Sequence, residues 1–469
     1  MHTSTTSTVP LVSWTAAQLL EATQGYWLND QAPNTEIKRI LTDSRDAEAG
    51  DAFLALKGER FDAHAFITQV AEQGCQVAIV SQPIDAEICQ LVVPDTRLAL
   101  GQLGAYRRAQ NPQLKVIALT GSSGKTTTKE MLGSILSRIA PTLVTRGNLN
   151  NDLGVPVMLL ELRPEHQYAV MELGASHQGE IDYTSNLVQP LVAGIINIGT
   201  AHLGEFGGRD GICRAKSEIY AHIAPNGTSI VPAADDFADS IRQAVQTEQV
   251  LSFGAGGEIF ATEIELQAQS ATFKLNTPQG VSQVNLPFAG EHNVQNATAA
   301  AAFALAIGIS LDDIVLGLEQ AVGAKGRLNF IQQGRHLLID DTYNANPTSM
   351  RAAAEVLAQQ EGVRVMVMGD IGELGSSAAQ QHYMLGRDLV SVKGLNFVVA
   401  VGEFAPAAQE GARSTQYGKK MQAFLTQEQA LPFLLSLIET HQPQSMSFLF
   451  KGSRYTHMET LMADLMEKL

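Results

Sequence analysis

The feature that most constrains the fold of this chain is a glycine-rich loop between an apolar strand and a helix. The segment VIALTGSSGKTTTKEML passes from apolar residues 116–119 into the loop at 121–126. Apolar residues then follow at 131, 132, 135, 136 and 139, which is helical spacing. A strand, a glycine loop and a helix in this order suit phosphate binding at a helix N-terminus. We therefore predict an α/β fold that binds a mononucleotide.

Each part of the loop has a chemical task. The backbone N–H groups expected to face phosphate oxygens belong to Gly121, Ser122, Ser123 and Gly124. Lys125 supplies a positive charge for the β- and γ-phosphates, and the Thr126 hydroxyl can ligate Mg²⁺. The loop is a shortened variant of GxxxxGK[ST], because Leu119 stands where the first glycine is expected. The alternative is a plain Gly-Ser turn between a strand and a helix.

Length and patterning predict three α/β domains. At about 150 residues per domain, 469 residues correspond to about three domains. A polar stretch around Pro112 marks a hinge, and we place a second hinge near residue 326. We predict a small N-terminal α/β domain (1–110), a central P-loop domain with a parallel sheet (111–326) and a C-terminal Rossmann-like α/β domain (327–469).

Hydrophobic periodicity locates the main elements of these domains. In the first domain we expect helices over 14–23 and 65–73 and strands over 77–80 and 91–93. In the central domain we expect strands over 116–119, 168–171 and 192–198, an antiparallel section within 260–284, and a buried Ala-rich helix over 297–306. In the third we expect strands over 337–339, 363–368, 397–401 and 446–450, and helices over 349–359 and 378–390.

Charge and composition exclude several classes of protein. The net charge is 32 − 48 = −16, so no basic surface for nucleic acid is expected. Cys75, Cys89 and Cys213 are too few for a disulfide framework and contain no CxxC pair. There is no signal-peptide pattern and no apolar run long enough to span a bilayer. We expect a soluble, cytoplasmic monomer with no nucleic-acid partner and no membrane span.

Several polar residues follow predicted strands, where α/β proteins bind ligands. Glu172 ends one strand and His202 lies in the loop after the next, so both are candidates for a metal site. The alternatives are a solvated strand-end acid and an ordinary loop histidine. Lys216 lies in a predicted helix, where a solvated lysine paired with an acid is the simpler interpretation.

A second set of polar residues surrounds the predicted junction with the third domain. Asn293 and Asn296 precede the Ala-rich helix and can either read an adenine edge or cap that helix. Arg327 can stabilise phosphate charge or form a linker salt bridge. Asp340 and Asp341 follow a strand and can either accept ribose hydroxyls or form an Asx turn before Pro347.

Taken in order, TGSSGKTTTKE, GNLNNDLGVP, VMELGASHQGEI, NIGTAHLGEFG, RAKSEIY, GEHNVQNATAA, GRLN and DDTYNANP closely resemble the Mur ligase family. The resemblance implies ATP-dependent amide bond formation: ATP phosphorylates a carboxylate, an amine attacks the acyl phosphate, and ADP and phosphate leave. TDSR, GDAFLALKGERFDAHAF, VMGDIGELG and FLFKGSRYTHME resemble the members that add D-alanyl-D-alanine to UDP-N-acetylmuramoyl-tripeptide, a step of peptidoglycan synthesis.

The resemblance also implies roles for individual residues. Lys125, Thr126 and Thr127 would bind ATP phosphates and Mg²⁺, and Glu172 would hold one magnesium. His202 would hold a second magnesium together with a carbamylated Lys216. Asn293 and Asn296 would contact adenine, Arg327 the γ-phosphate, and Asp341 the ribose or the hinge, with Asp340 as the fallback.

For the other substrate, the resemblance assigns the first domain to the uridine diphosphate end. The residues implied there are Ser44, Arg45, Asp62 and His64, whereas Asn148 and Asn151 would face the muramoyl peptide. Three alternatives stay open: a ligase that adds the third amino acid, although its DNPR-like signature is missing; a folylpolyglutamate synthase; and a P-loop ATP switch without ligase activity.

Overall fold

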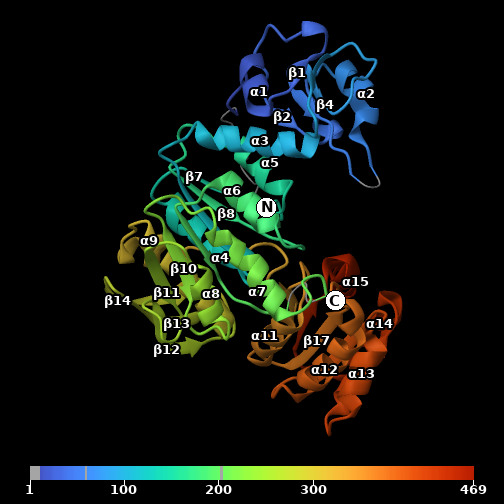
Figure 1. Ribbon diagram of the computed structural model, residues 1–469. Helices are drawn as coiled ribbons and strands as arrows, with labels where there is room; N and C mark the ends of the chain where they lie inside the picture. The colour runs from blue at the N-terminus through green and yellow to red at the C-terminus, as the bar shows by residue number, and fades with distance from the viewer. Residues whose placement is uncertain (1–10, 59–60, 201–203) are drawn as a thin grey trace. The chain divides into compact units, whose positions relative to one another are not determined.

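The computed structural model (Figure 1) describes residues 11–58, 61–200 and 204–469. The chain divides into two compact units. Unit 1 comprises Met1–Ala118, Ala140–Ala175 and Glu180–Pro190, and unit 2 comprises Leu119–Ile139, Ser176–Gly179 and Leu191–Leu469. The predicted domain boundaries at 110 and 326 stay predictions beside this division. Among the described residues, no helix is long and apolar enough to cross a bilayer.

Unit 1 begins with a five-stranded sheet in the order β1-β5-β4-β3-β2, in which only β1 pairs antiparallel. Its strands are β1 (Tyr26–Trp27), β2 (Ile40–Leu41), β3 (Ala52–Leu54), β4 (Val77–Val80) and β5 (Cys89–Val92). Its helices are α1 (Ala16–Thr23), α2 (Ile67–Glu72) and α3 (Thr96–Ala109). The predicted first helix and the strands at 77–80 and 91–93 are confirmed, and Thr15 caps α1 through a reciprocal capping box.

The P-loop segment has the predicted form. Strand β6 (Lys115–Thr120) leads into the loop, and helix α4 (Lys125–Ser137) begins immediately after Gly124. The apolar residues of α4 at 131, 132, 135 and 136 are fully buried, as the helical spacing predicted. The prediction is wrong for Ile139, which lies beyond the end of α4 and is 41% exposed. Because α4 starts at Lys125, both Lys125 and Thr126 belong to the first helical turn rather than to the loop itself.

A six-stranded sheet contains β6 and has the order β11-β10-β9-β6-β8-β7. Its other strands are β7 (Thr142–Val144), β8 (Tyr168–Glu172), β9 (Val192–Ile195), β10 (Thr228–Pro232) and β11 (Gln249–Phe253). The helices in this part of the chain are α5 (Gly154–Leu160), α6 (Glu180–Val188), α7 (Arg209–Ser217) and α8 (Ala238–Ala244). The predicted strand over 192–198 is too long, because β9 ends at Ile195 and residues 196–198 already form the following loop.

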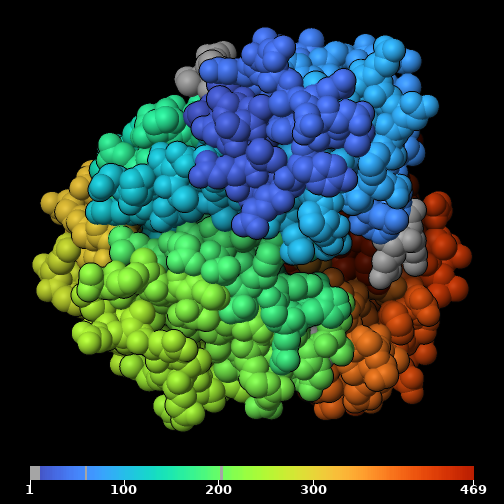
Figure 2. Space-filling model, turned by 45° about the horizontal axis from the view of Figure 1, so that its top comes forward, coloured from blue at the N-terminus to red at the C-terminus, as the bar shows by residue number. Residues whose placement is uncertain are grey.

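An antiparallel excursion follows, as predicted, and its surface belongs to the yellow-green area of Figure 2. Strands β12 (Phe260–Leu266), β13 (Ala271–Thr277) and β14 (Gly280–Leu286) form a three-stranded sheet that precedes α9 (Glu291–Ala306) and α10 (Leu311–Glu319). Burial of the Ala-rich helix is confirmed. Its predicted start at residue 297 is wrong, because α9 begins at Glu291, directly after Gly290.

The last part of unit 2 is a six-stranded sheet in the order β15-β16-β20-β17-β18-β19, with β15 antiparallel at one edge. Its strands are β15 (Asn329–Gln333), β16 (His336–Asp340), β17 (Val363–Gly369), β18 (Phe397–Val401), β19 (Met421–Phe424) and β20 (Met446–Lys451). Its helices are α11 (Pro347–Ala358), α12 (Ala378–Ser391), α13 (Ala405–Arg413), α14 (Gln427–Thr440) and α15 (Met458–Met466). The predicted α/β pattern of this region is confirmed, but the sequence pattern predicts neither the strands β15 and β19 nor the helices α13, α14 and α15.

Candidate functional site

The phosphate loop depends on glycine at its last position. Gly124 has φ +79°, a left-handed conformation that favours glycine, and a Cβ there would lie 2.2 Å from Asn296 Oδ1. Lys125, the next residue, donates from Nζ to the Gly121 carbonyl at 2.8 Å. The lysine side chain therefore bonds back to the first residue of the loop. At Gly124, where α9 approaches, the loop has no room for a side chain.

Two asparagines that the sequence did not single out brace this loop. Asn197, after β9, accepts the Ser123 N–H at Oδ1 (3.0 Å) and donates from Nδ2 to the Ser123 carbonyl (2.9 Å). Its own carbonyl accepts the Ser122 N–H at 3.1 Å. Asn346, before α11, donates to Ser123 Oγ at 2.9 Å. Both asparagines lie in segments noted in the sequence, NIGTAHLGEFG and DDTYNANP, but only the fold brings them to the loop.

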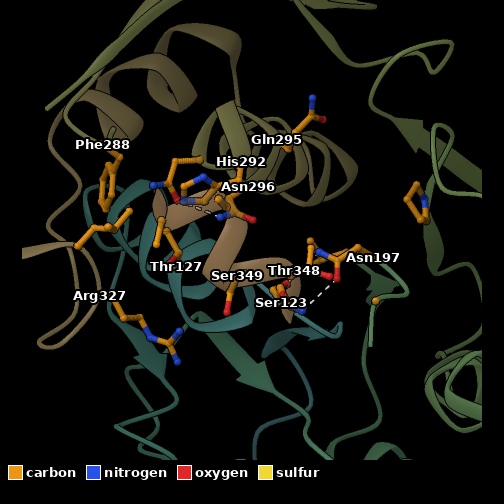
Figure 3. Close-up of a pocket in the computed structure, with 18 of the residues that line it drawn as sticks. Ser123, Thr127, Asn197, Phe288, His292, Gln295, Asn296, Arg327, Thr348 and Ser349 are labelled. Carbon is orange, nitrogen blue, oxygen red and sulfur yellow. Dashed lines mark hydrogen bonds between the residues drawn. The ribbon is translucent and has the colours of Figure 1, made fainter. Parts of the chain in front are cut away.

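A pocket of ≈ 570 Å³ opens beside the loop, entirely within unit 2 (Figure 3). It brings together seven of the residues predicted for the site: Ser123, Gly124, Thr127, Asn293, Asn296, Arg327 and Asp341. Figure 3 labels four of them, Ser123, Thr127, Asn296 and Arg327, together with Thr348 and Ser349 from the start of α11. Phe253, Phe288 and Pro232 add apolar surface to the wall, so the pocket combines a flat apolar part with polar groups, as small-molecule sites commonly do.

The two asparagines of α9 lie inside the helix rather than before it. Asn293 donates to the Ala289 carbonyl at 2.8 Å, and Asn296 donates to Asn293 Oδ1 at 3.0 Å. The helix-capping interpretation is therefore wrong, because the N-cap is Gly290. The neighbouring His292 also lines the pocket, and burial lowers its pKa from 6.5 to about 4. The imidazole is neutral at pH 7 and offers one donor and one acceptor.

Arg327 reaches the phosphate loop from the segment before β15. Its guanidinium donates to Thr126 Oγ1 at 3.0 Å and lies 4.5 Å from the centre of the Tyr343 ring. Within the described residues it forms no linker salt bridge, so that interpretation is wrong. A guanidinium held against the first turn of the P-loop helix is well placed to meet phosphate oxygens.

The structure separates the two neighbouring aspartates. Asp340, the last residue of β16, accepts the N–H and the hydroxyl of Thr342, which is the Asx turn considered from the sequence. Asp341 lines the pocket instead and forms a buried ion pair with Lys451 at 2.7 Å. Burial raises the pKa of Asp341, although Lys451 and Arg327 oppose the shift. Lys451 was noted only as part of FLFKGSR.

The backbone after β9 is held on both sides of one residue, Ile198. Asp235 accepts the Ile198 N–H at 2.8 Å, while Arg209 donates to the Ile198 carbonyl at 2.6 Å and pairs with Asp236. Asp235, Arg209 and Ile198 all line the pocket. These contacts fix the backbone directly after β9.

The candidate metal ligands are buried where they are described. Glu172 is 1% exposed at the end of β8 and accepts a hydrogen bond from Asn150 Nδ2 at 2.7 Å. Lys216, in α7, is 2% exposed. The solvated interpretations of both residues are therefore wrong. His202 lies outside the described residues, and the part that is described contains no group of three or more His, Cys, Asp or Glu arranged to hold a metal.

The residues predicted for the second substrate lie in unit 1, mostly in short turns. Ser44 and Arg45 occupy a turn capped by Asp43, which pairs with Arg45 at 2.5 Å. This exposed pair lowers the pKa of Asp43 to about 2, chiefly through the Arg45 hydrogen bonds. Asp62 accepts from His64 Nδ1 at 2.6 Å, and the Ser81 N–H donates to His64 Nε2 at 2.9 Å. Both ring nitrogens of His64 are thus engaged within the protein.

The two remaining asparagines lie between β7 and α5. Asn151 accepts the Gly154 N–H at 2.8 Å, and the Asn148 carbonyl accepts the Asn150 N–H at 2.8 Å. Asn150, which the sequence did not single out, is the residue that bonds Glu172. The GNLNNDLGVP segment therefore connects a predicted peptide-facing loop with a predicted metal ligand inside unit 1.

Three family models match consecutive parts of the chain. The model of the Mur ligase family catalytic domain matches residues 36–118. The Mur ligase middle domain matches residues 119–304, and the Mur ligase glutamate ligase domain matches residues 326–454. The pocket is lined by residues from the ranges matched by the second and third models.

Known proteins are similar to this chain over nearly its full length. The UDP-N-acetylmuramoyl-tripeptide--D-alanyl-D-alanine ligase of Escherichia coli (strain K12) is 41% identical over 461 residues, 97% of this chain and 99% of that protein. Crystal structure I of MurF from Acinetobacter baumannii superposes with a TM-score of 0.95 at 76% identity, covering 98% of this chain and 100% of that one. The MurF ligase of Thermotoga maritima, solved with ADP, has a TM-score of 0.80 at 26% identity, with 92% and 97% covered.

Proposed function

The chain belongs to the Mur ligase family, and we propose that it joins D-alanyl-D-alanine to UDP-N-acetylmuramoyl-tripeptide at the expense of ATP. The products are the UDP-muramoyl-pentapeptide, ADP and phosphate. The observation that carries the proposal is the match to a curated ligase of this specificity at 41% identity over 97% of the chain. We place the reaction in the cytoplasm, in peptidoglycan synthesis, and so in cell wall biogenesis, cell shape and cell division.

The proposed reaction needs positioning and charge neutralisation rather than a protein nucleophile. The terminal carboxylate of the tripeptide attacks the γ-phosphorus of ATP, and ADP leaves. The free amine of D-alanyl-D-alanine then attacks the carbonyl of the acyl phosphate, and phosphate leaves as the amide bond forms. Developing charge on the phosphates favours fixed cations, and the phosphate loop has two beside it, Lys125 and Arg327.

We assign the nucleotide to the pocket in unit 2. Gly121, Ser122, Ser123, Gly124, Lys125, Thr126 and Thr127 would hold its phosphates. Asn293 and Asn296 would meet adenine, and neutral His292 stands beside them on the same helix. Arg327 would meet the γ-phosphate and Asp341 the ribose. The ADP complex of the Thermotoga maritima relative supports nucleotide binding by this fold.

We assign magnesium to Thr126, Glu172, His202 and Lys216. The donor chemistry fits, because hydroxyl and carboxylate oxygens suit Mg²⁺ and Glu172 presents a carboxylate that is 1% exposed. Lys216 fits only as its carbamate, since a buried ammonium cannot ligate a cation; the carbamate would supply an anionic oxygen. When bound, the metal would neutralise phosphate charge.

We assign the UDP-muramoyl-tripeptide to the first domain. Ser44 and Arg45 lie in an exposed turn that can meet the diphosphate, whereas Asp62 and His64 order the next turn along the chain. Asn148 and Asn151 would face the peptide. The domain division that goes with these assignments is 1–110, 111–326 and 327–469, and the third domain would close over ATP and the dipeptide.

The test is a substrate-omission assay. Phosphate release is expected only when ATP, UDP-muramoyl-tripeptide and D-alanyl-D-alanine are all present, with the pentapeptide as the product. Equal release without either acceptor or donor would identify an ATP switch. Product formation with UDP-muramoyl-dipeptide and a diamino acid would identify the third-residue ligase, and activity with folate and glutamate would identify a folylpolyglutamate synthase.

A further inference from the structure

Ser123 is held at three of its polar groups. Its N–H and its carbonyl are both bonded to the side chain of Asn197, at 3.0 and 2.9 Å. Its hydroxyl oxygen accepts a hydrogen bond from Asn346 Nδ2 at 2.9 Å. A serine hydroxyl has one proton to donate, and no oxygen in the part of the chain that the structure describes accepts it. Because Ser123 lines the pocket, that proton is available to a ligand there.

Asn346 reaches Ser123 from the start of a helix that follows 223 residues later in the sequence. It is the N-cap of α11, where its Oδ1 accepts the Ser349 N–H at 2.8 Å and its own N–H donates to Ser349 Oγ at 3.0 Å. The same side chain therefore uses its oxygen for the helix and its nitrogen for the phosphate loop. Thr348 and Ser349, in the first turn of this helix, line the same pocket as Ser123 (Figure 3).

We propose that Asn346 is a positioning residue for the nucleotide phosphates and that it acts through Ser123. By donating to the Ser123 oxygen, Asn346 leaves the serine proton free to point into the pocket as a donor for a phosphate oxygen. Asn197 fixes the backbone from which that hydroxyl projects. This inference rests on the proposed nucleotide site. It explains how Asn346, which does not itself line the pocket, takes part in ATP binding.

A purely structural role is the competing explanation, because an N-cap by itself stabilises a helix. Asn346→Ser separates the two roles: a serine keeps an oxygen that can cap α11, but it is too short to donate to Ser123. Ser123→Ala removes the hydroxyl itself. Thr15→Ala is the matched control, because Thr15 forms the same type of capping box on α1, in unit 1.

The measurement is calorimetric binding of the ATP analogue AMP-PNP and of adenosine to the full-length protein and its variants. Asn346→Ser and Ser123→Ala are each expected to weaken AMP-PNP binding about fivefold, the factor that one neutral hydrogen bond carries. Adenosine, which has no phosphates, is expected to bind as in the wild type. The double variant is expected to bind AMP-PNP no more weakly than Ser123→Ala does.

Three results would overturn the proposal: wild-type AMP-PNP affinity in Asn346→Ser, a multiplicative loss of about 25-fold in the double variant, or an equal loss for adenosine. Melting temperatures accompany each titration. Thr15→Ala is expected to lower the melting temperature without changing AMP-PNP affinity. The AMP-PNP titration needs no peptide substrate. If the ligase assignment is wrong, only the substrate-omission assay will show it, and the titration still tests the role of Asn346.

Discussion

The nucleotide pocket of unit 2 and the polar turns of unit 1 are held together in different ways. In the pocket, Arg327 bonds Thr126 across 201 residues of sequence, and Asn346 bonds Ser123 across 223. In unit 1, Arg45 bonds Asp43 and His64 bonds Asp62, each only two residues away. The pocket thus exists only when distant segments have folded together, whereas the unit 1 turns carry much of their own geometry. A substitution in the pocket should therefore affect both stability and nucleotide binding, and one in the exposed turns should affect binding alone.

The largest effect is expected at Lys216. Lys216→Ala removes the buried lysine whose carbamate we assign to magnesium, so turnover should fall at least about 100-fold. Added bicarbonate should not restore turnover, but short carboxylates should restore part of it by supplying the missing oxygens. Carbon-13 spectra in labelled bicarbonate should show a carbamate signal in the wild type and not in the variant.

Lys419, an exposed lysine of unit 2, provides the control, and Lys419→Ala is expected to keep both the carbamate signal and the turnover. Near-normal turnover of Lys216→Ala would return Lys216 to a structural role.

The same contrast between distant and local contacts explains how much could be predicted from the sequence. The strand, glycine loop and helix of the P-loop are local, and the pattern located them correctly. The start of α9 was missed because Glu291, His292 and Asn293 are polar and lack an apolar stripe, although Gly290 marks the boundary. Asn197 and Asn346 give no local signal of their roles, because each acts on a loop that only the folded chain brings close.

Register decided a further case that the sequence left open. Asp340 and Asp341 are adjacent and chemically identical, so no pattern distinguishes them. In the structure, Asp340 is the last residue of β16 and pairs with Asn329 of β15, and its carboxylate accepts a hydrogen bond from the Thr342 hydroxyl. The Asp341 N–H bonds the Phe450 carbonyl, which leaves its carboxylate beside Lys451 in the pocket. Because β16 ends at Asp340, the next residue, Asp341, is the aspartate whose carboxylate lies in the pocket.

A second prediction tests the steric fit of the phosphate loop. Gly124→Ala and Gly147→Ala both place a side chain at positive φ, +79° and +56°, but only at Gly124 does the new Cβ meet a neighbour, Asn296 Oδ1. Gly147→Ala should cost about 1 kcal/mol of unfolding free energy from backbone strain. Gly124→Ala should cost about 2 to 3 kcal/mol and weaken AMP-PNP binding, because Asn296 must move. Equal costs in urea unfolding would show that Asn296 does not constrain the loop.

A third prediction concerns pH. The pKa of His292 falls from 6.5 to about 4 in the folded protein, because partial burial disfavours the protonated imidazole and the Lys451 ammonium repels its charge. Between pH 6.5 and 4 the unfolded chain binds a proton that the folded chain does not, so stability should decrease as the pH falls through this window. Solvent in the pocket moderates the effect, which we place at about 1 to 3 kcal/mol.

The free energy of unfolding, measured in urea at pH 7, 5.5 and 4.5, gives the slope of stability against pH. His292→Gln should flatten it, whereas His457→Gln, which alters an exposed histidine, should leave it as in the wild type. An unchanged slope in His292→Gln would mean that the acid sensitivity of unit 2 arises elsewhere.

The smallest effect is expected in unit 1, at the exposed pair of Arg45 and Asp43. Because the Arg45 side chain is 85% exposed and that of Asp43 is 39% exposed, Arg45→Ala should leave the melting temperature unchanged, as for most surface ion pairs. If Arg45 meets the diphosphate, the KM for UDP-muramoyl-tripeptide should rise about fivefold while the KM for ATP stays constant. Lys274→Ala, which breaks an exposed pair with Glu263, should change neither KM. A fall in melting temperature, or an equal rise of both KM values, would show that this turn is coupled to the rest of the molecule as tightly as the nucleotide pocket is.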